Sequence, residues 1–204
     1  LLYKISGSWG NHEGSLLLWL LILTFSILLY FLNSLQRPFK ERYFTLIFQQ
    51  IIIIGFSSFT IFTSSPFKMI NPTPIDGLGL NPILQDPLLA IHPPVLYLGY
   101  VSTSIIFSSS LASLIIGKVD SSWAKHIGKW VFFSWTFLTS GILLGSIWAY
   151  YELGWGGFWF WDPVENVSLM PWLSLTALIH CILILEKRST LKSWSVILSI
   201  STFT

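Results

Sequence analysis

Long apolar runs separated by short charged segments constrain this chain more than any other feature. Charged residues make up 10% of its 204 residues, whereas soluble domains carry about a quarter. A membrane-spanning helix needs about 20 largely apolar residues. The sequence therefore predicts an all-α polytopic membrane protein with five or six transmembrane helices, near residues 16–32, 44–62, 94–116, 130–149 and 168–185, and with a sixth starting in 194–204.

The fifth run is the shortest, and Pro171 is expected in its first turn, where a missing N–H breaks no hydrogen bond. The first run is predicted to be a retained helix, because residues 1–15 lack the compact apolar core of a signal peptide. The single cysteine, Cys181, excludes an internal disulfide and is interpreted as a packed thiol. Without an internal repeat or a second domain in the sequence, residues 1–204 are predicted to form one membrane domain.

Charged side chains assign the predicted helix ends to sides of the membrane. If the chain crosses at every apolar run, nine of the eleven basic residues fall on one face: Arg37, Lys40, Arg42, Lys118, Lys125, Lys129, Lys187, Arg188 and Lys192. The positive-inside rule turns that face toward the cytoplasm or an organelle matrix. Residues 63–93 and 150–167 then form outer-face loops, with too few cations nearby to bind nucleic acid.

The 150–167 loop contains the segment WGGFWFWDPVEN, and nine aromatic residues lie between Trp148 and Trp172. An interfacial aromatic belt explains one or two tryptophans per helix end, but not a cluster around glycines. Glycines allow close approach to the backbone, rings offer a stacking surface, and Asp162 followed by Pro163 is expected to start a short helix. A flat apolar ring system fits such a loop, with haem first and quinone second.

Two histidines stand out by their predicted depth. His92 precedes Pro93, which disfavours helical geometry at the residue before it, so an extended His92 is expected at the outer membrane surface. An axial ligand and a plain interfacial histidine are equally good interpretations of this position. His180 is expected about 12 Å beyond Trp172 inside the bilayer, where a functional role is the default for an ionisable group. A hydrogen bond to a neighbouring helix is the alternative.

The other two histidines carry weaker signals. His12 lies beside Glu13 just before the first apolar run, where it could cap the helix or contact lipid headgroups. His126 lies in WAKHIGK, which is predicted to be a short basic loop with a solvated histidine. The chain contains no phosphate-binding glycine loop, no metalloprotease histidine motif and no serine nucleophile motif.

Four segments resemble the CcmF family of cytochrome c haem lyases. WAYYELGWGGFWFWDPVENVSLMPWL is similar to the tryptophan-rich WWD signature of haem-handling proteins, and its DPVEN and MPW continuation is similar to the CcmF version. The segments SGSWGNHEGSLLLW, NPILQDPLLAIHPPVLYLGY and TALIHCILILEKR resemble the same family, in the same order. The resemblance covers nearly the whole chain.

The resemblance implies a role for each matched residue. His92 matches an outer-face histidine that ligates haem in transit, and His180 matches a membrane-embedded histidine that ligates a resident haem b. His12 is a third candidate whose role the resemblance does not specify. The haem-handling WWD loop is represented by Trp148, Trp155, Gly156, Gly157, Trp159, Trp161, Asp162, Pro163, Glu165 and Asn166.

The resemblance also implies a reaction and partners. The reaction is covalent thioether attachment of the haem vinyl groups to the Cys-x-x-Cys-His motif of apocytochrome c. The family has two further histidines, one on the outer face and one in the membrane, that this sequence does not contain. We therefore expect an incomplete part of a multi-subunit enzyme, joined by a further CcmF fragment with those histidines, a haem chaperone and thiol-handling maturation subunits in the lipid bilayer.

Two other interpretations fit the residues considered alone. A quinol-oxidising or electron-transfer membrane subunit would also use a buried histidine and aromatic loops, and a structural scaffold would need neither histidine. Composition rich in Ile, Phe, Leu and Ser, together with the expected division of the family protein, favours the mitochondrial inner membrane with the WWD loop facing the intermembrane space. A bacterial inner membrane with a periplasmic loop is the alternative.

Overall fold

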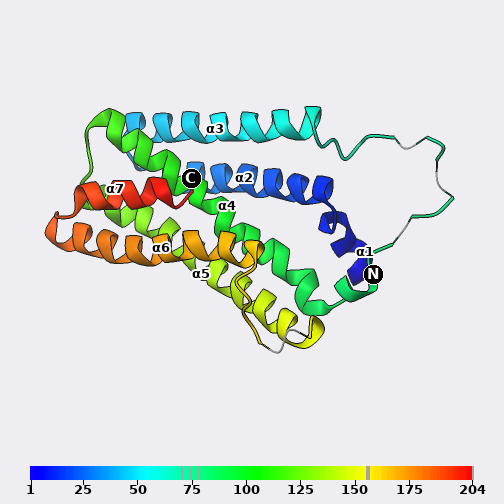
Figure 1. Ribbon diagram of the computed structural model, residues 1–204. Coiled ribbons are helices and arrows are strands. Elements are labelled where there is room, and N and C mark those ends of the chain that lie inside the picture. The colour runs from blue at the N-terminus through cyan, green and yellow to red at the C-terminus, as the bar shows by residue number, and fades with distance from the viewer. Residues whose placement is uncertain (70, 74, 78, 155–156, 204) are drawn as a thin grey trace.

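The computed structural model describes residues 1–69, 71–73, 75–77, 79–154 and 157–203. Every regular element in these ranges is helical (Figure 1). Five elements, α2 to α6, are long and apolar enough to cross a membrane, which confirms the predicted all-α polytopic fold. The elements are α1 (Leu2–Ser6), η1 (Gly7–Trp9), α2 (His12–Asn33), α3 (Phe39–Phe62), η2 (Pro82–Leu84), α4 (Pro87–Ile116), α5 (Ser121–Glu152), α6 (Pro163–Arg188) and α7 (Lys192–Ser201).

Consecutive long helices run in opposite directions, so their connections gather at two ends of the bundle (Figure 1). The α2–α3 and α4–α5 connections share one end with the end of α6, and we term it the basic end because the nine basic residues named above lie there. The N-terminus, the α3–α4 segment and the α5–α6 connection share the opposite end, which we term the aromatic end. This is the alternation that the charge pattern predicts.

All five spans begin several residues before their predicted positions, and an aspartate caps three of them. Asp86 Oδ1 accepts the N–H groups of Leu88 at 2.8 Å and Leu89 at 3.1 Å at the start of α4. Asp120 and Asp162 cap α5 and α6 in the same way. Capping satisfies N–H groups that have no partner within the first turn. The outer connections are therefore 63–86 and 153–162, shorter than the predicted 63–93 and 150–167.

Prolines inside helices correct a second expectation. Pro93 and Pro94 lie within α4, and Pro171 lies within α6 rather than in a first turn. Each proline removes one hydrogen bond to the carbonyl four residues earlier, and the remaining ladder continues on both sides. The predicted sixth span is α7, whose ten residues are too few for a candidate span in the described part of the chain.

Helix α4 forms the centre of the bundle and contacts α2, α3, α5 and α7. In its most apolar stretch 67% of the residues are buried, against 22–33% in the other four spans, so the outer faces of those spans are left for lipid or for other polypeptides. Glycines bring α4 and α5 close together, with Gly99 against Leu138 and Gly141 against Leu96. This close packing positions the site described next.

Candidate functional site

His92 lies inside α4, five residues after the helix begins at Pro87. The predicted extended conformation is wrong, because the Asp86 cap starts the helix upstream of Pro93 and His92 is held by helical neighbours on both sides. A rise of 1.5 Å per residue puts His92 about 8 Å along α4 from the aromatic end. Its side chain is half-buried within the helix bundle and does not lie free on the membrane surface.

Two glycines of α5 set the orientation of the His92 imidazole. Its Nδ1 lies 2.8 Å from the carbonyl oxygen of Gly141. Because a carbonyl only accepts, Nδ1 carries the proton and Nε2 keeps its lone pair. Gly145 lies against the ring, and a Cβ there would stand 2.6 Å from His92 Cε1. Sequence reasoning missed both glycines, although small residues four apart on one helix face are a known signal for close packing.

His92 lines a hollow of about 220 Å³ between α4, α5 and the start of α6. Trp148, Asp162 and Glu165 line the same hollow, so residues from two separate sequence motifs meet here. The buried indole Nε1 of Trp148 has no hydrogen-bond partner among the described residues. A buried donor without a hydrogen-bond partner requires an explanation. A bound ligand whose oxygen accepts this hydrogen bond would explain it.

A second hollow of about 290 Å³, lined mainly by apolar side chains, lies next to the first. Cofactor sites measure about 300–1,000 Å³, so a haem would need both hollows. The second hollow is lined by aromatic and aliphatic side chains that suit a porphyrin face, Trp19, Tyr97 and Tyr100 among them. The residues shared by the two hollows are Leu96, Val164 and Ser168.

The carboxylates of the WWD loop hold the loop in place. Asp162 Oδ1 accepts the Glu165 N–H at 2.7 Å, and Glu165 Oε2 accepts the N–H groups of Phe160 at 2.8 Å and Asp162 at 3.3 Å. Asn166 Nδ2 donates to the carbonyl oxygen of Trp161 at 3.0 Å. This capping box confirms that Asp162 starts a helix, although α6 has 26 residues and is not short.

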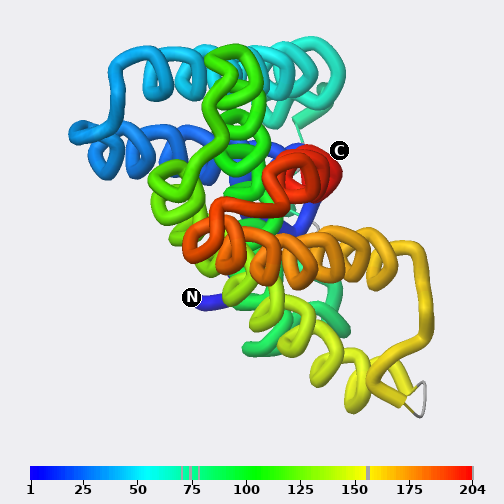
Figure 2. The backbone as a smooth tube through the Cα atoms, turned by 90° about the vertical axis from the view of Figure 1, so that its left-hand side faces the viewer, coloured from blue at the N-terminus to red at the C-terminus, as the bar shows by residue number. Residues whose placement is uncertain are grey.

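Residues 157–162 run along the edge of the bundle between the end of α5 and the start of α6 (Figure 2), and most of their aromatic side chains are exposed. Phe158 is 65% exposed and Trp161 is 68% exposed. Trp159 is half-buried and packs edge-to-face on Trp161, with ring centroids 5.9 Å apart. A contiguous exposed apolar patch marks a binding surface for protein, membrane or ligand.

The glycines of the loop differ in what their positions require. Gly154 has a φ of 63°, in the left-handed region that glycine adopts at no steric cost. A Cβ on Gly157 would meet the Phe160 ring at 3.8 Å, an ordinary contact, so the expected backbone approach of a ligand there stays a prediction. Trp155 and Gly156 lie outside the described residues. Pro163 is the first residue of α6.

His180 lies on the exposed face of α6. Its Nδ1 is 2.8 Å from the carbonyl oxygen of Thr176 on the same helix, so Nε2 again keeps its lone pair. The alternative of a hydrogen bond to a neighbouring helix has no support among the described contacts. Ionisable side chains within membrane spans almost always face protein or a water-filled cavity.

His180 lies in the second half of α6. Because α6 begins at Pro163, His180 is about 26 Å along the helix from that residue and about 12 Å from Arg188 at the basic end. The depth of His180 in the bilayer stays a prediction. It was based on Trp172, whose indole Nε1 donates to Thr139 of α5 at 2.8 Å.

The contacts of α5 give the separation of the two histidines along the bundle. His92 contacts Gly141, whereas Trp135 donates to Thr176, one turn before His180, at 3.0 Å. His180 is therefore level with a point about ten residues before Gly141, a separation of about 15 Å along the bundle. A single iron atom cannot bind both imidazoles, so they belong to separate sites.

The remaining histidines lie apart from both positions. His12 is exposed, and its Nε2 lies 3.0 Å from Ser64 Oγ near the aromatic end. His126 corrects the prediction of a solvated loop, because it lies within α5 and its half-buried ring packs edge-on to Tyr30 at 5.6 Å. No group of three or more His, Cys, Asp or Glu side chains suited to a metal ion occurs in the described ranges.

Comparisons with known proteins assign the chain to a family. The profile of the family described as Cytochrome C assembly protein matches residues 9–204. The chain belongs to this family. It is 55% identical over 203 residues to the cytochrome c-type biogenesis protein CycK of Rhizobium meliloti, covering 100% of this chain and 30% of that protein. It is 48% identical over 205 residues to CcmF of Escherichia coli, covering 98% of this chain and 31% of that protein.

A solved structure of cytochrome c heme lyase CcmF has the same fold as this member of the cytochrome c assembly family. The TM-score is 0.84 at 30% sequence identity, covering all of this chain and 32% of the other. The resemblance to CcmF that the motifs indicate is thereby confirmed. The chain spans about three tenths of the length of these relatives.

Proposed function

We propose that this chain holds haem at the aromatic end of the membrane for covalent attachment to apocytochrome c, as part of a cytochrome c haem lyase. The main support is the setting of His92. Its Nδ1–H is held by the Gly141 carbonyl and its Nε2 keeps a lone pair, in a hollow that the start of α6 also lines. Histidines that bind metals usually donate the other ring N–H to such an acceptor.

In this proposal His92 Nε2 binds the iron of the haem to be transferred. The buried Trp148 N–H, which has no acceptor in the described part of the chain, donates to an oxygen of that haem. The exposed rings of Phe158 and Trp161 cover a porphyrin face, and Gly157 and Trp159 continue this surface. Trp155 and Gly156, which lie outside the described residues, are proposed to handle the haem with them.

The reaction needs positioning more than acid or base chemistry from the loop. Each cysteine S–H of the apocytochrome adds across a haem vinyl group, with sulfur bonding to one carbon and hydrogen to the other. The carboxylates of Asp162 and Glu165 are engaged with backbone N–H groups, so their role is to fix the loop. Alignment of two reactants can supply much of a rate enhancement.

His180 is proposed to bind a resident haem b on the exposed face of α6. Its Nδ1 is bonded to the Thr176 carbonyl, which leaves Nε2 suited to iron. A resident haem supplies electron transfer. Because His180 is exposed in this chain, another CcmF segment is proposed to cover it and to supply the second ligand of the resident haem. A further outer-face histidine of that segment is proposed as the second ligand of the haem at His92.

We further propose that the complex includes a haem chaperone and thiol-handling subunits, in the mitochondrial inner membrane with the aromatic end facing the intermembrane space. The composition rich in Ile, Phe, Leu and Ser supports an organelle origin, and the basic end supports the orientation.

Replacement of His92 by Ala tests the proposal. We expect membrane insertion at the wild-type level and loss of covalent haem in c-type cytochromes, measured by haem staining of denatured membrane proteins. Normal cytochrome c maturation in His92→Ala cells would overturn the assignment. Loss of quinol oxidation with maturation intact would instead identify an electron-transfer subunit.

A further inference from the structure

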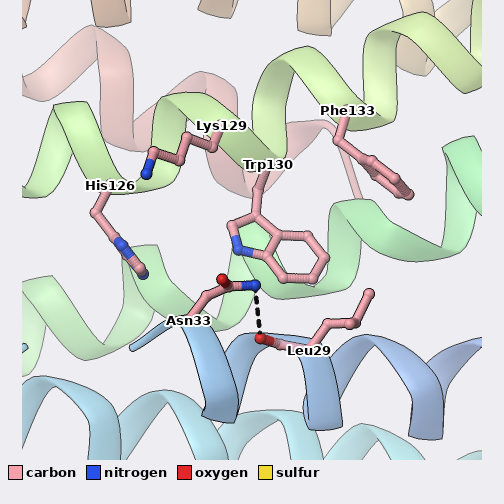
Figure 3. Close-up of a pocket in the computed structure, with 6 residues that line it drawn as sticks. All are labelled: Leu29, Asn33, His126, Lys129, Trp130 and Phe133. Carbon is pink, nitrogen blue, oxygen red and sulfur yellow. Dashed lines mark hydrogen bonds between the residues drawn. The ribbon is translucent and has the colours of Figure 1, made fainter. Parts of the chain in front are cut away.

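A cleft at the basic end has no part in the proposed haem chemistry. It measures about 180 Å³ and lies between the end of α2 and the start of α5 (Figure 3). Its lining residues are Leu29, Asn33, His126, Lys129, Trp130 and Phe133. It lies at the opposite end of the bundle from the WWD loop.

The cleft is polar toward the membrane surface and apolar toward the bilayer. Asn33 is the last residue of α2, and Leu29 lies one turn deeper on the same helix. Lys129 lies near the start of α5, and Phe133 lies one turn deeper. The side chains of both helices point into the same space (Figure 3). A molecule that fits the cleft needs a polar head at the membrane surface and an apolar body toward the bilayer interior.

The polar half of the cleft offers donors and positive charge. His126 Nε2 is buried without a hydrogen-bond partner among the described residues. Lys129 is exposed, and no described carboxylate forms an ion pair with it. Asn33 Nδ2 is already bonded to the Leu29 carbonyl at 2.9 Å. The lining contains no acidic residue, so the polar half suits an anion.

Two nearby cations, Arg37 and Lys118, are engaged with partners of their own. Arg37 forms bonds of 2.8–3.1 Å to Glu41, and Lys118 lies 3.3 Å from Asp120. Lys129 is therefore the charge that the cleft contributes to a ligand. Basic pockets between transmembrane helices on the cytoplasmic or matrix side are a recognised kind of site for anionic lipid headgroups.

We propose that the α2–α5 cleft binds one anionic phospholipid from the leaflet at the basic end. Lys129 and His126 hold the phosphate, and an acyl chain lies along Leu29, Trp130 and Phe133. The apolar half favours a lipid over free phosphate, because a small ion would leave these side chains uncovered. The site is independent of the proposed haem chemistry, since its residues lie at the other end of the bundle.

The test uses the full chain, purified with its co-purifying subunits and reconstituted in phosphatidylcholine. The relative association constants of spin-labelled phosphatidylglycerol and spin-labelled phosphatidylcholine are measured from the motionally restricted fraction. The wild-type protein should prefer phosphatidylglycerol. A basic residue near the surface contributes about 1 kcal/mol, so Lys129→Gln should weaken that preference about fivefold, and Lys129→Arg should retain it.

Lys125→Gln is the matched control, because Lys125 is an exposed cation one turn earlier on the same helix and outside the cleft. It should weaken the preference much less than Lys129→Gln does, because Lys125 does not line the cleft. Equal effects of Lys125→Gln and Lys129→Gln would show diffuse surface charge and overturn the site, as would no preference over phosphatidylcholine. Inorganic phosphate at constant ionic strength should not displace the lipid, and full displacement would identify a phosphate site instead.

Discussion

The Nδ1–H of His92 on α4 donates to the carbonyl oxygen of Gly141 on α5 at 2.8 Å. This bond joins two helices whose contact depends on small residues, and it sets both the tautomer and the direction of the imidazole. Gly145, one turn farther along α5, lies against the same ring. The Gly141 carbonyl thus holds the proposed haem ligand in place, and the lack of a side chain at Gly145 leaves room for its ring.

Gly145→Ala is expected to disable the site without removing any proposed ligand. The added Cβ would stand 2.6 Å from His92 Cε1, so the imidazole must move. A misplacement of about 1 Å can reduce a rate about a hundredfold, and we expect a loss of that order in cytochrome c maturation, measured by haem staining. Gly55→Ala is the control, because no described atom beyond its chain neighbours and its own helix backbone lies within 4 Å of the added Cβ. Equal maturation in both variants would contradict this packing.

Glu165 is expected to act through the structure of the loop. Its Oε2 accepts two backbone N–H groups, and a glutamine could keep one oxygen acceptor there. Glu165→Gln should retain most activity, whereas Glu165→Ala should lose about 1–3 kcal/mol of local stability, seen as faster hydrogen exchange in residues 157–162. If Gln and Ala are equally inactive while exchange is unchanged, the negative charge itself is required.

The two proposed haem sites should respond independently to mutation. Because His92 and His180 lie about 15 Å apart along the bundle, His180→Ala should remove the absorbance of the resident haem and His92→Ala should preserve it. The measurement is a reduced-minus-oxidised spectrum of the purified complex. Loss of the same haem in both variants would show that the histidines share a site.

Thiols placed at the two ends of the bundle should react with a maleimide added to opposite sides of the membrane. In a Cys181→Ser background, Phe158→Cys and Lys125→Cys each present one exposed thiol. A membrane-impermeant maleimide added to the outer side should modify the thiol at position 158 and leave the thiol at position 125 unmodified until the membrane is opened. Labelling of both positions from one side would contradict the five-span topology.

Helix boundaries show where sequence reasoning fell short. Hydropathy located the five spans but placed the start of each several residues late, because a window of apolar residues misses the polar first turn of a helix and the residue that caps it. Asp162 was recognised as a helix start from its Asp-Pro pair, whereas the equivalent pair at Asp86 was not. That omission led to the wrong conformation for His92.

The sequence by itself determined the number of spans, their alternation and the cap at Asp162, because hydropathy, charge and capping act on each residue and its near neighbours. Only the tertiary structure decided that Gly141 and Gly145 hold His92 and that His180 faces outward. Those outcomes depend on how α4 packs on α5 and how α5 aligns with α6. Such packing is set by the shapes of surfaces about fifty residues apart in the chain, which no local pattern in the sequence contains.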